Sequence, residues 1–131
     1  MGLANRPEDV PLTNPRIGIL APPSDFTALD GRRISADAQD ITVRVLSLNN
    51  VHRVSPLTSA LCLAAASRIE GTIPHLLARA NGDDLRIGTP SGVLAVGAEV
   101  TKEDDQWWVV STRSYRTARR LMQGSVLIPK R

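Results

Sequence analysis

The sequence predicts an α+β domain in which a mostly antiparallel sheet wraps around one central buried helix. The helix is predicted at about residues 55–69, because this segment is apolar all round and leaves no wide polar stripe. A strand is predicted before it, at residues 40–48, and several more are predicted after residue 85. One helix among strands that tight turns connect is typical of the α+β class.

The predicted helix has recognisable start and stop residues. Ser55 is expected to cap the first turn, and Pro56 suits the first helical position because its missing N–H costs nothing there. Gly71 favours termination, since glycine adopts the left-handed closing conformation without strain. The segment is too short to span a bilayer. We therefore expect a core helix, with Cys62 packed inside it and unreactive.

Two strands are predicted before the helix. Residues 16–21 form a short apolar run, which predicts a buried strand that ends at Pro22. In residues 40–48 the apolar side chains fall on alternate positions, which indicates a half-buried strand. The turns in this part of the chain are predicted at residues 30–31 and 49–50.

The chain beyond the helix is predicted to be mostly strand. Residues 73–80 are ambiguous, because Pro74 can open a short helix or lie beside an edge strand. The predicted turns are residues 81–84, 88–92 and 103–105, and the predicted strands are residues 85–87, 93–100, 107–112 and 126–128. Residues 116–123 fit a helical turn and an extended strand equally well.

Composition sets the class of protein. The chain has 131 residues, enough for one domain, which we place at residues 16–131 after a loosely held lead-in at 1–15. Aromatic residues make up only 3%, so the core is expected to be aliphatic. One cysteine excludes a disulfide framework and a cysteine zinc site. Without a secretory signal or a long apolar run, we expect a cytoplasmic protein with no membrane partner.

The basic residues do not by themselves indicate a nucleic-acid partner. The net charge is only +3. The last part of the chain concentrates basic side chains without any acid, namely Arg113, Arg116, Arg119, Arg120, Lys130 and Arg131. Stacking aromatic residues are not interleaved with them beyond Tyr115. We expect a solvated face, or a face that meets acidic groups of a further domain, and no nucleic acid.

A series of short motifs, in order along nearly the whole chain, resembles the PrpF family of 2-methylaconitate cis-trans isomerases and their methylitaconate and oxalomesaconate isomerase relatives. The motifs lie at residues 21–23, 25, 30–31, 43–44, 47, 52–53, 57–60, 69–72, 87–92 and 116–124. The resemblance covers only the C-terminal part of family members. It implies a diaminopimelate-epimerase-like fold of two similar domains, of which this chain matches one, and a link to propionate catabolism through the methylcitrate cycle.

The resemblance also implies a chemistry. Family members shift a proton next to a carboxylate-bearing double bond without a cofactor or a metal, in a cleft into which two helix N-termini point. At the start of the central helix, Thr58 and Ser59 can add hydroxyl donors to a site for a substrate carboxylate. Plain helix capping by Ser55 is the competing interpretation. A family lysine thought to act in catalysis belongs to the domain that this chain does not match.

Three further residues are predicted to belong to the site. Arg53 can clamp a carboxylate, and His52 can orient or transfer a proton. Both also fit an ordinary strand end at the surface. Ser91, in the turn at residues 88–92, can present its hydroxyl to a ligand, although a turn between strands needs no such role.

Two functions remain open from the sequence. The first is a C-terminal fragment of a PrpF-like isomerase, inactive without an N-terminal domain that a partner chain would supply. The second is a stand-alone homodimeric binding or assembly module, because unpaired strand edges readily pair with other chains. A small carboxylate ligand and a homo-oligomer are the corresponding expectations.

Overall fold

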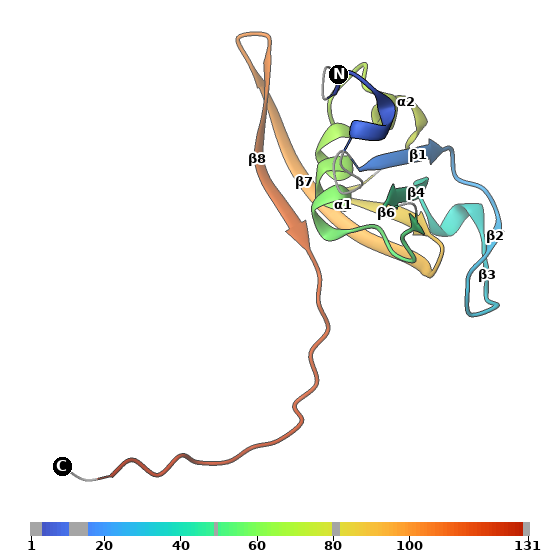
Figure 1. Cartoon of the computed structure of the whole chain (residues 1–131). Coiled ribbons are helices and arrows are strands. Elements are labelled where there is room, and N and C mark those ends of the chain that lie inside the picture. The colour runs from blue at the N-terminus through green and yellow to red at the C-terminus, as the bar shows by residue number, and fades with distance from the viewer. Residues whose placement is uncertain (1–3, 11–15, 49, 80–81, 130–131) are drawn as a thin grey trace.

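The computed structural model describes residues 4–10, 16–48, 50–79 and 82–129, and it shows an α+β fold in which one curled sheet packs against a central helix (Figure 1). The helix, α1, is Leu57–Ala66, and a shorter helix, α2, is Ile73–Leu77. The strands of the main sheet are β1 Ile17–Ala21, β4 Ile41–Ser47, β5 Asn50–Val51, β6 Asp84–Thr89, β7 Gly92–Glu103 and β8 Gln106–Ser114. The predicted α+β class is confirmed.

The order of the strands explains the position of α1. The sheet runs β1-β4-β6-β7-β8, with β5 added to β4, and only β4 and β6 are parallel. Parallel neighbours require a crossover connection. Both α1 and α2 lie in that crossover, so α1 is carried across one face of the sheet. A small hairpin of β2 Phe26–Thr27 and β3 Arg33–Ile34 stands apart from this sheet.

Small side chains let the sheet approach the helix closely. On α1, Ala60 and Ala64 are almost completely buried, and Leu63 belongs to the same core cluster. The sheet presents alternate aliphatic residues to this face, because side chains of a strand alternate between its two sides. They are Ile41, Val43, Val45, Leu85, Ile87, Val96 and Ala98. The core is therefore aliphatic, as the composition predicts.

Both ends of α1 differ from the prediction of a helix at about residues 55–69. The helix ends at Ala66 with Ser67 as its C-cap in a right-handed conformation, so the prediction that Gly71 terminates it is wrong. Gly71 does adopt a left-handed φ of +83°, but in the turn that follows the helix. Ser55 does not cap the helix: Pro56 occupies the N-cap position, and no side chain accepts from the first turn. The Ser55 hydroxyl lies near the Pro56 carbonyl instead, at 3.5 Å. The proline's extended backbone takes the place that a capping serine would need.

The helix is not buried on every side. Cys62 is exposed, and Leu57 keeps 38% of its surface in contact with solvent. The expectation of a core cysteine is wrong, because β6, β7 and β8 pack against one side of α1, while the side toward β1, on which Cys62 lies, stays open. The strand at residues 16–21 shows the same effect, since Ile17 and Ile19 are 58% and 59% exposed although the strand itself forms.

The turns of the second half mostly follow the prediction. Pro90 and Ser91 form the tight turn between β6 and β7. Asp104 and Asp105 form the next one with φ of 47° and 62°, as a two-residue hairpin turn requires. Of the two alternatives predicted for residues 73–80, the structure shows the short helix, over Ile73–Leu77, and the Thr72 side chain caps its first turn by accepting from His75 N. Asn49 and Asn81, in two other predicted turns, lie outside the described residues, as does most of the lead-in.

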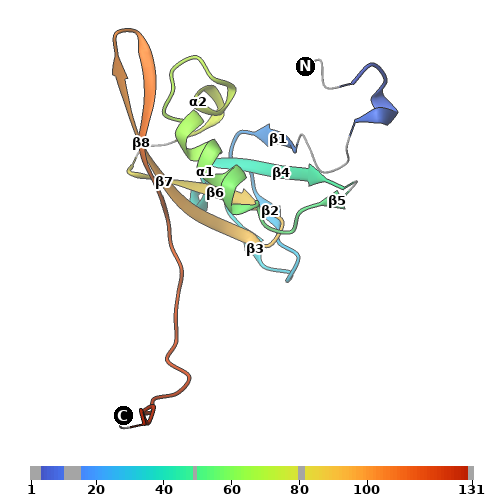
Figure 2. The ribbon, with the colours of Figure 1, turned by 60° about the vertical axis from the view of Figure 1, so that its left-hand side comes forward.

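The predicted last strand, residues 126–128, is not formed. Residues 115–129, which we call the C-terminal arm, contain neither helix nor strand and run away from the body of the molecule (Figures 1 and 2). A strand needs a neighbouring strand to bond, and the described part of the chain offers none to the arm. Residues 116–123 thus form neither the helical turn nor the strand that were the two predicted alternatives. Within the described ranges no helix is long and apolar enough to cross a membrane.

Candidate functional site

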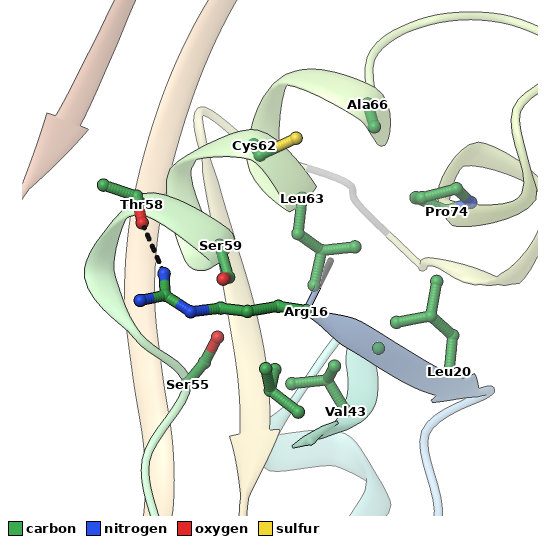
Figure 3. A pocket seen from close by; sticks show the side chains of 12 residues that line it. Arg16, Leu20, Val43, Ser55, Thr58, Ser59, Cys62, Leu63, Ala66 and Pro74 are labelled. Atoms are coloured by element: carbon green, nitrogen blue, oxygen red, sulfur yellow. Dashed lines mark hydrogen bonds between the residues drawn. The ribbon is translucent and has the colours of Figure 1, made fainter. Parts of the chain in front are cut away.

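The open side of α1 forms one wall of a groove. The groove has a volume of about 360 Å³ and lies between α1 and the inner faces of β1 and β4 (Figure 3). We call it the α1–β1 groove. Its lining residues are Arg16, Gly18, Leu20, Val43, Val45, Ser55, Thr58, Ser59, Cys62, Leu63, Ala66 and Pro74. Two of the five predicted site residues, Thr58 and Ser59, are among them.

The groove has a polar end at the start of α1. There the Arg16 guanidinium reaches from the beginning of β1 and its Nη1 donates to Thr58 Oγ1 at 3.3 Å (Figure 3). The hydroxyls of Ser55 and Ser59 lie at the same end, and Ser55 is only 7% exposed. The described residues that line the groove supply one cation and three hydroxyls and no acid. This end is therefore suited to an anion.

The helix itself adds to this preference. The first backbone N–H groups of a helix have no partner within the helix, and they give its N-terminus a partial positive charge. On α1 no side chain caps them, because Pro56 occupies the N-cap position. A carboxylate placed between Arg16 and these N–H groups would meet charge and hydrogen-bond donors from two sides.

The other end of the groove is apolar. Leu20 of β1, Leu63 and Ala66 of α1 and Pro74 of α2 surround it, and Cys62 lies at its side (Figure 3). Val43 and Val45 form the floor. The alternation of β1 decides which side chains enter, since Gly18 and Leu20 face the groove while Ile17 and Ile19 face outward.

The remaining predicted site residues lie elsewhere. His52 is half-buried, and its Nε2 is 2.6 Å from Ser47 Oγ, while its backbone N–H donates to Val45 O. Arg53 is exposed, and its carbonyl accepts from Ser91 N at 2.9 Å. The structure thus brings Arg53 and Ser91 together, but none of these three residues lines the α1–β1 groove. Their role in binding stays a prediction.

Arg16 is the residue that the sequence did not single out. Nothing in its local pattern distinguishes it from an arginine that precedes an ordinary strand. Its meeting with Thr58 spans 42 positions of the chain. The register of β1 on β4, with Ile17 opposite Leu46 and Ala21 opposite Thr42, carries Arg16 to the start of α1.

A second hollow, of about 530 Å³, lies on a different part of the surface. It is lined by Arg68, Asp83, Ala98, Glu99, Val100 and Arg113. Its lining contains two cations and two acids, and Arg113 Nη2 donates to the backbone carbonyl of Asp83 at 3.4 Å. It therefore shows no preference for one charge. Over the ranges that the structure describes, no three His, Cys, Asp or Glu side chains gather in a group able to hold a metal ion.

A mostly antiparallel sheet that curls around one central helix is the architecture of a domain of the diaminopimelate-epimerase-like class. The crystal structure of methylitaconate-delta-isomerase has this fold and aligns with the chain at a TM-score of 0.66 and 28% identity. The alignment covers 80% of this chain and 28% of that one. The chain belongs to the PrpF family, because the family model for PrpF proteins matches residues 1–129.

Relatives with known names agree with this membership. The chain is 36% identical over 117 residues to the 2-methyl-aconitate isomerase of Shewanella oneidensis, a match that covers 88% of the chain and 30% of the relative. It is 34% identical over 116 residues to the 2-methyl-aconitate isomerase of Cupriavidus necator, covering 88% and 29%. The 3-methylitaconate isomerase of Eubacterium barkeri is 34% identical over 119 residues, with 88% and 30% covered. The chain thus spans less than a third of the length of these relatives.

Proposed function

We propose that this chain supplies one wall of the substrate cleft of a cofactor-independent isomerase, and that it binds a carboxylate of the substrate at the start of α1. The substrate class is 2-methylaconitate or a similar unsaturated di- or tricarboxylate, by analogy with the relatives that bear such names. The observation that carries the proposal is the polar end of the groove, where Arg16, Thr58 and the uncapped first turn of α1 lie together. None of the described residues that line the groove is acidic.

We further propose that the chain does not catalyse the isomerisation alone. A proton shift requires a base that removes a proton and an acid that returns one, both within reach of the substrate. Among the described residues that line the groove, Cys62 is the one whose side chain is of a type that serves as a general acid or base. One such group does not supply both a base and an acid on the two sides of a substrate. In this proposal the groove holds and orients a carboxylate, and at least one proton-transferring group comes from outside it.

A second candidate function is that of a homodimeric binding or assembly module without catalysis. It is favoured by one specific observation, the exposure of large apolar side chains along the C-terminal arm. Surface of this kind is typical of a contact with another chain. In this function the polar end of the groove would be an ordinary solvated surface.

One experiment separates the two functions. Isomerisation of 2-methylaconitate is followed by NMR for the chain alone, and for the chain mixed with the part of the Shewanella oneidensis relative that it does not match. The first function predicts turnover in the mixture and none with either piece. Turnover by the chain alone would contradict its catalytic incompleteness.

The binding site is tested in the same samples. Titration of the isotope-labelled chain with 2-methylaconitate is expected to shift the backbone amide signals of residues 57–60 first, because they form the proposed carboxylate site. Absence of any shift at these amides, together with no turnover in the mixture, would contradict the isomerase role. The assembly module would then be the remaining candidate function.

A further inference from the structure

We propose that the α1–β1 groove takes a carboxylate that carries a short alkyl chain, with the carboxylate at the polar end and the chain along the apolar end. The inference rests on the proposed carboxylate site at the start of α1 and specifies which carboxylates suit it. For a di- or tricarboxylate substrate it means that one carboxylate enters the groove and the others stay outside.

The polar end of the groove holds a buried hydroxyl without a close partner among the described residues. Ser55 is 7% exposed, and its Oγ lies 3.5 Å from the Pro56 carbonyl, beyond the range of about 2.5–3.0 Å of an O–H···O hydrogen bond. The hydroxyl points toward the Arg16 side chain (Figure 3). Buried polar groups normally have a partner, so Ser55 and Arg16 together indicate a ligand oxygen at this end.

The side of α1 that lines the groove changes from polar to apolar along the helix. Thr58 and Ser59 in the first turn carry hydroxyls, Cys62 and Leu63 follow one turn later, and Ala66 is the last helical residue. At a rise of about 1.5 Å per residue, Leu63 lies roughly 6 Å and Ala66 roughly 10 Å along the axis from Ser59. A ligand that fills the groove must therefore be charged at one end and apolar at the other.

This spacing sets the length of the alkyl chain. With C–C bonds of about 1.5 Å, the five bonds of an extended six-carbon chain span roughly 6 Å. A carboxylate at the first turn of α1 then brings the sixth carbon level with Leu63, in the apolar end. The groove volume of about 360 Å³ lies near the lower limit of the range of roughly 300–1,000 Å³ that is usual for small-molecule sites. Hexanoate is therefore a probe of matched length.

The apolar end disfavours a second carboxylate. Leu20, Leu63, Ala66 and Pro74 surround it, and Arg16 at the other end is the one cation among the described residues that line the groove. A carboxylate in such surroundings loses its hydration and gains no hydrogen bond. Adipate has the same six-carbon chain as hexanoate and a second carboxylate at its far end. The groove should bind hexanoate in preference to adipate.

A polypeptide segment is the other candidate occupant, because the relatives contain a long portion that this chain does not match. Such a segment can pair with the free edge of β1, which bonds to β4 alone among the described strands. It would then lie in the sheet about 4.8 Å beside β1, whereas the groove lies over the inner faces of β1 and β4. A backbone inserted into the groove itself would leave N–H and C=O groups unpaired against aliphatic side chains. An alkyl chain has no such groups, so the groove favours it.

Titrations of the isotope-labelled full chain with hexanoate and adipate test the inference. The backbone amides of residues 57–60 report on the carboxylate end, and those of Leu63 and Ala66 report on the apolar end. We expect hexanoate to shift both sets and to bind at least tenfold more tightly than adipate. Butyrate, which is two methylenes shorter, should bind several-fold more weakly than hexanoate, because one fully buried methylene corresponds to about fourfold in affinity.

Ala66→Lys is designed to remove the preference for hexanoate. Ala66 is half-buried and lines the apolar end, and a cation in the last turn of a helix is favourable. The new ammonium can pair with the second carboxylate of adipate, so we expect adipate to bind this variant at least as tightly as hexanoate. Ile73→Lys is the matched control, because Ile73 is 65% exposed and is not among the residues that line the groove. It should leave the ratio of the two affinities within twofold of that of the unmodified chain.

The possible failures point to different causes. Equal binding of adipate and hexanoate by the unmodified chain would overturn the inference, because the far end of the ligand would then lie outside the apolar end. Loss of hexanoate binding when the unmatched part of the Shewanella oneidensis relative is added would show that polypeptide fills the groove. Shifts with 2-methylaconitate but none with hexanoate would overturn this inference alone. Absence of shifts with every carboxylate would overturn the proposed carboxylate site as well.

Discussion

Asp40 and Arg86 are joined by contacts from both their side chains and their backbones. Arg86 Nη2 lies 2.6 Å from Asp40 Oδ1, and Arg86 N donates to Asp40 Oδ2 at 2.7 Å. Asp40 N in turn donates to Arg86 O. The pair stands at the start of β4 and within β6, where the parallel pairing itself spans only two residue pairs. It therefore fixes the one parallel junction of the sheet, on which the crossover through α1 depends.

Replacing Arg86 tests this junction. The Asp40 side chain is only 5% exposed, while that of Arg86 is 47% exposed, so Arg86→Ala leaves a buried carboxylate without its cation. We expect the free energy of unfolding to fall by about 2–3 kcal/mol, less than for a fully buried pair because water reaches Arg86. Urea denaturation measures the change.

Arg33→Ala is the matched control, because Arg33 also pairs with a carboxylate, that of Asp25, at 2.9 Å. Its side chain is 80% exposed, so the expected loss is below about 1 kcal/mol. Equal losses in the two variants would contradict the structural role of Arg86.

Gly88→Ala should also destabilise the fold. A Cβ at this position would lie 1.6 Å from Gln39 Oε1 and 2.6 Å from its Cδ. Gln39 is buried, and it donates to Ser24 O at 2.7 Å and accepts from Thr42 Oγ1. The methyl group must displace it, and we expect a loss of about 1–3 kcal/mol in thermal or urea unfolding. Gly18→Ala, whose Cβ meets its nearest neighbour at 3.9 Å, should change the unfolding free energy by under about 1 kcal/mol. A larger loss of unfolding free energy for Gly18→Ala than for Gly88→Ala would contradict the close packing of Gln39 against Gly88.

Tyr115 should titrate above the ordinary tyrosine range. Its hydroxyl donates to Asp84 Oδ1 at 2.9 Å, and this bond to an anion favours the protonated phenol, so the pKa of Tyr115 is raised above 10.0. The bond is present at neutral pH, and its contribution to stability is lost as the pH rises through the raised pKa. Because the chain has one tyrosine, absorbance at 295 nm during alkaline titration follows this group alone.

Asp84→Asn provides the comparison. It removes the negative charge that opposes ionisation, so we expect the Tyr115 pKa to fall toward 10.0. An identical titration curve in the two proteins would show that the hydroxyl does not bond to Asp84 in solution.

Arg16→Ala should weaken binding of a carboxylate ligand. Arg16 is the one cation among the described residues that line the α1–β1 groove. Loss of a charge-assisted hydrogen bond from it is expected to lower the affinity about tenfold. Calorimetric or NMR titration with 2-methylaconitate measures it. Arg53→Ala distinguishes the two predicted binding regions, because Arg53 lies outside the groove and its loss should leave affinity at the groove unchanged. If only Arg53→Ala weakens binding, the carboxylate site lies at the Arg53–Ser91 contact instead.

The sequence by itself determined the central helix, most strands of the sheet and the family. The apolar segment that becomes α1, the alternation of Ile41, Val43 and Val45, and the Asp104–Asp105 turn are all local signals. Such signals act over a few residues, so they are readable before the chain is folded. For the same reason Thr58 and Ser59 could be placed at the helix start that forms one end of the groove.

Only the tertiary structure decided which surfaces remain open. Arg16 meets Thr58 through the register of β1 on β4, and Asp40 meets Arg86 across the parallel pair, both more than 40 positions apart. Whether Cys62 is buried depends on what covers the second face of α1, and whether residues 126–128 form a strand depends on a neighbour with which to pair. Burial and strand pairing are properties of two segments together, so the pattern of one segment cannot determine them.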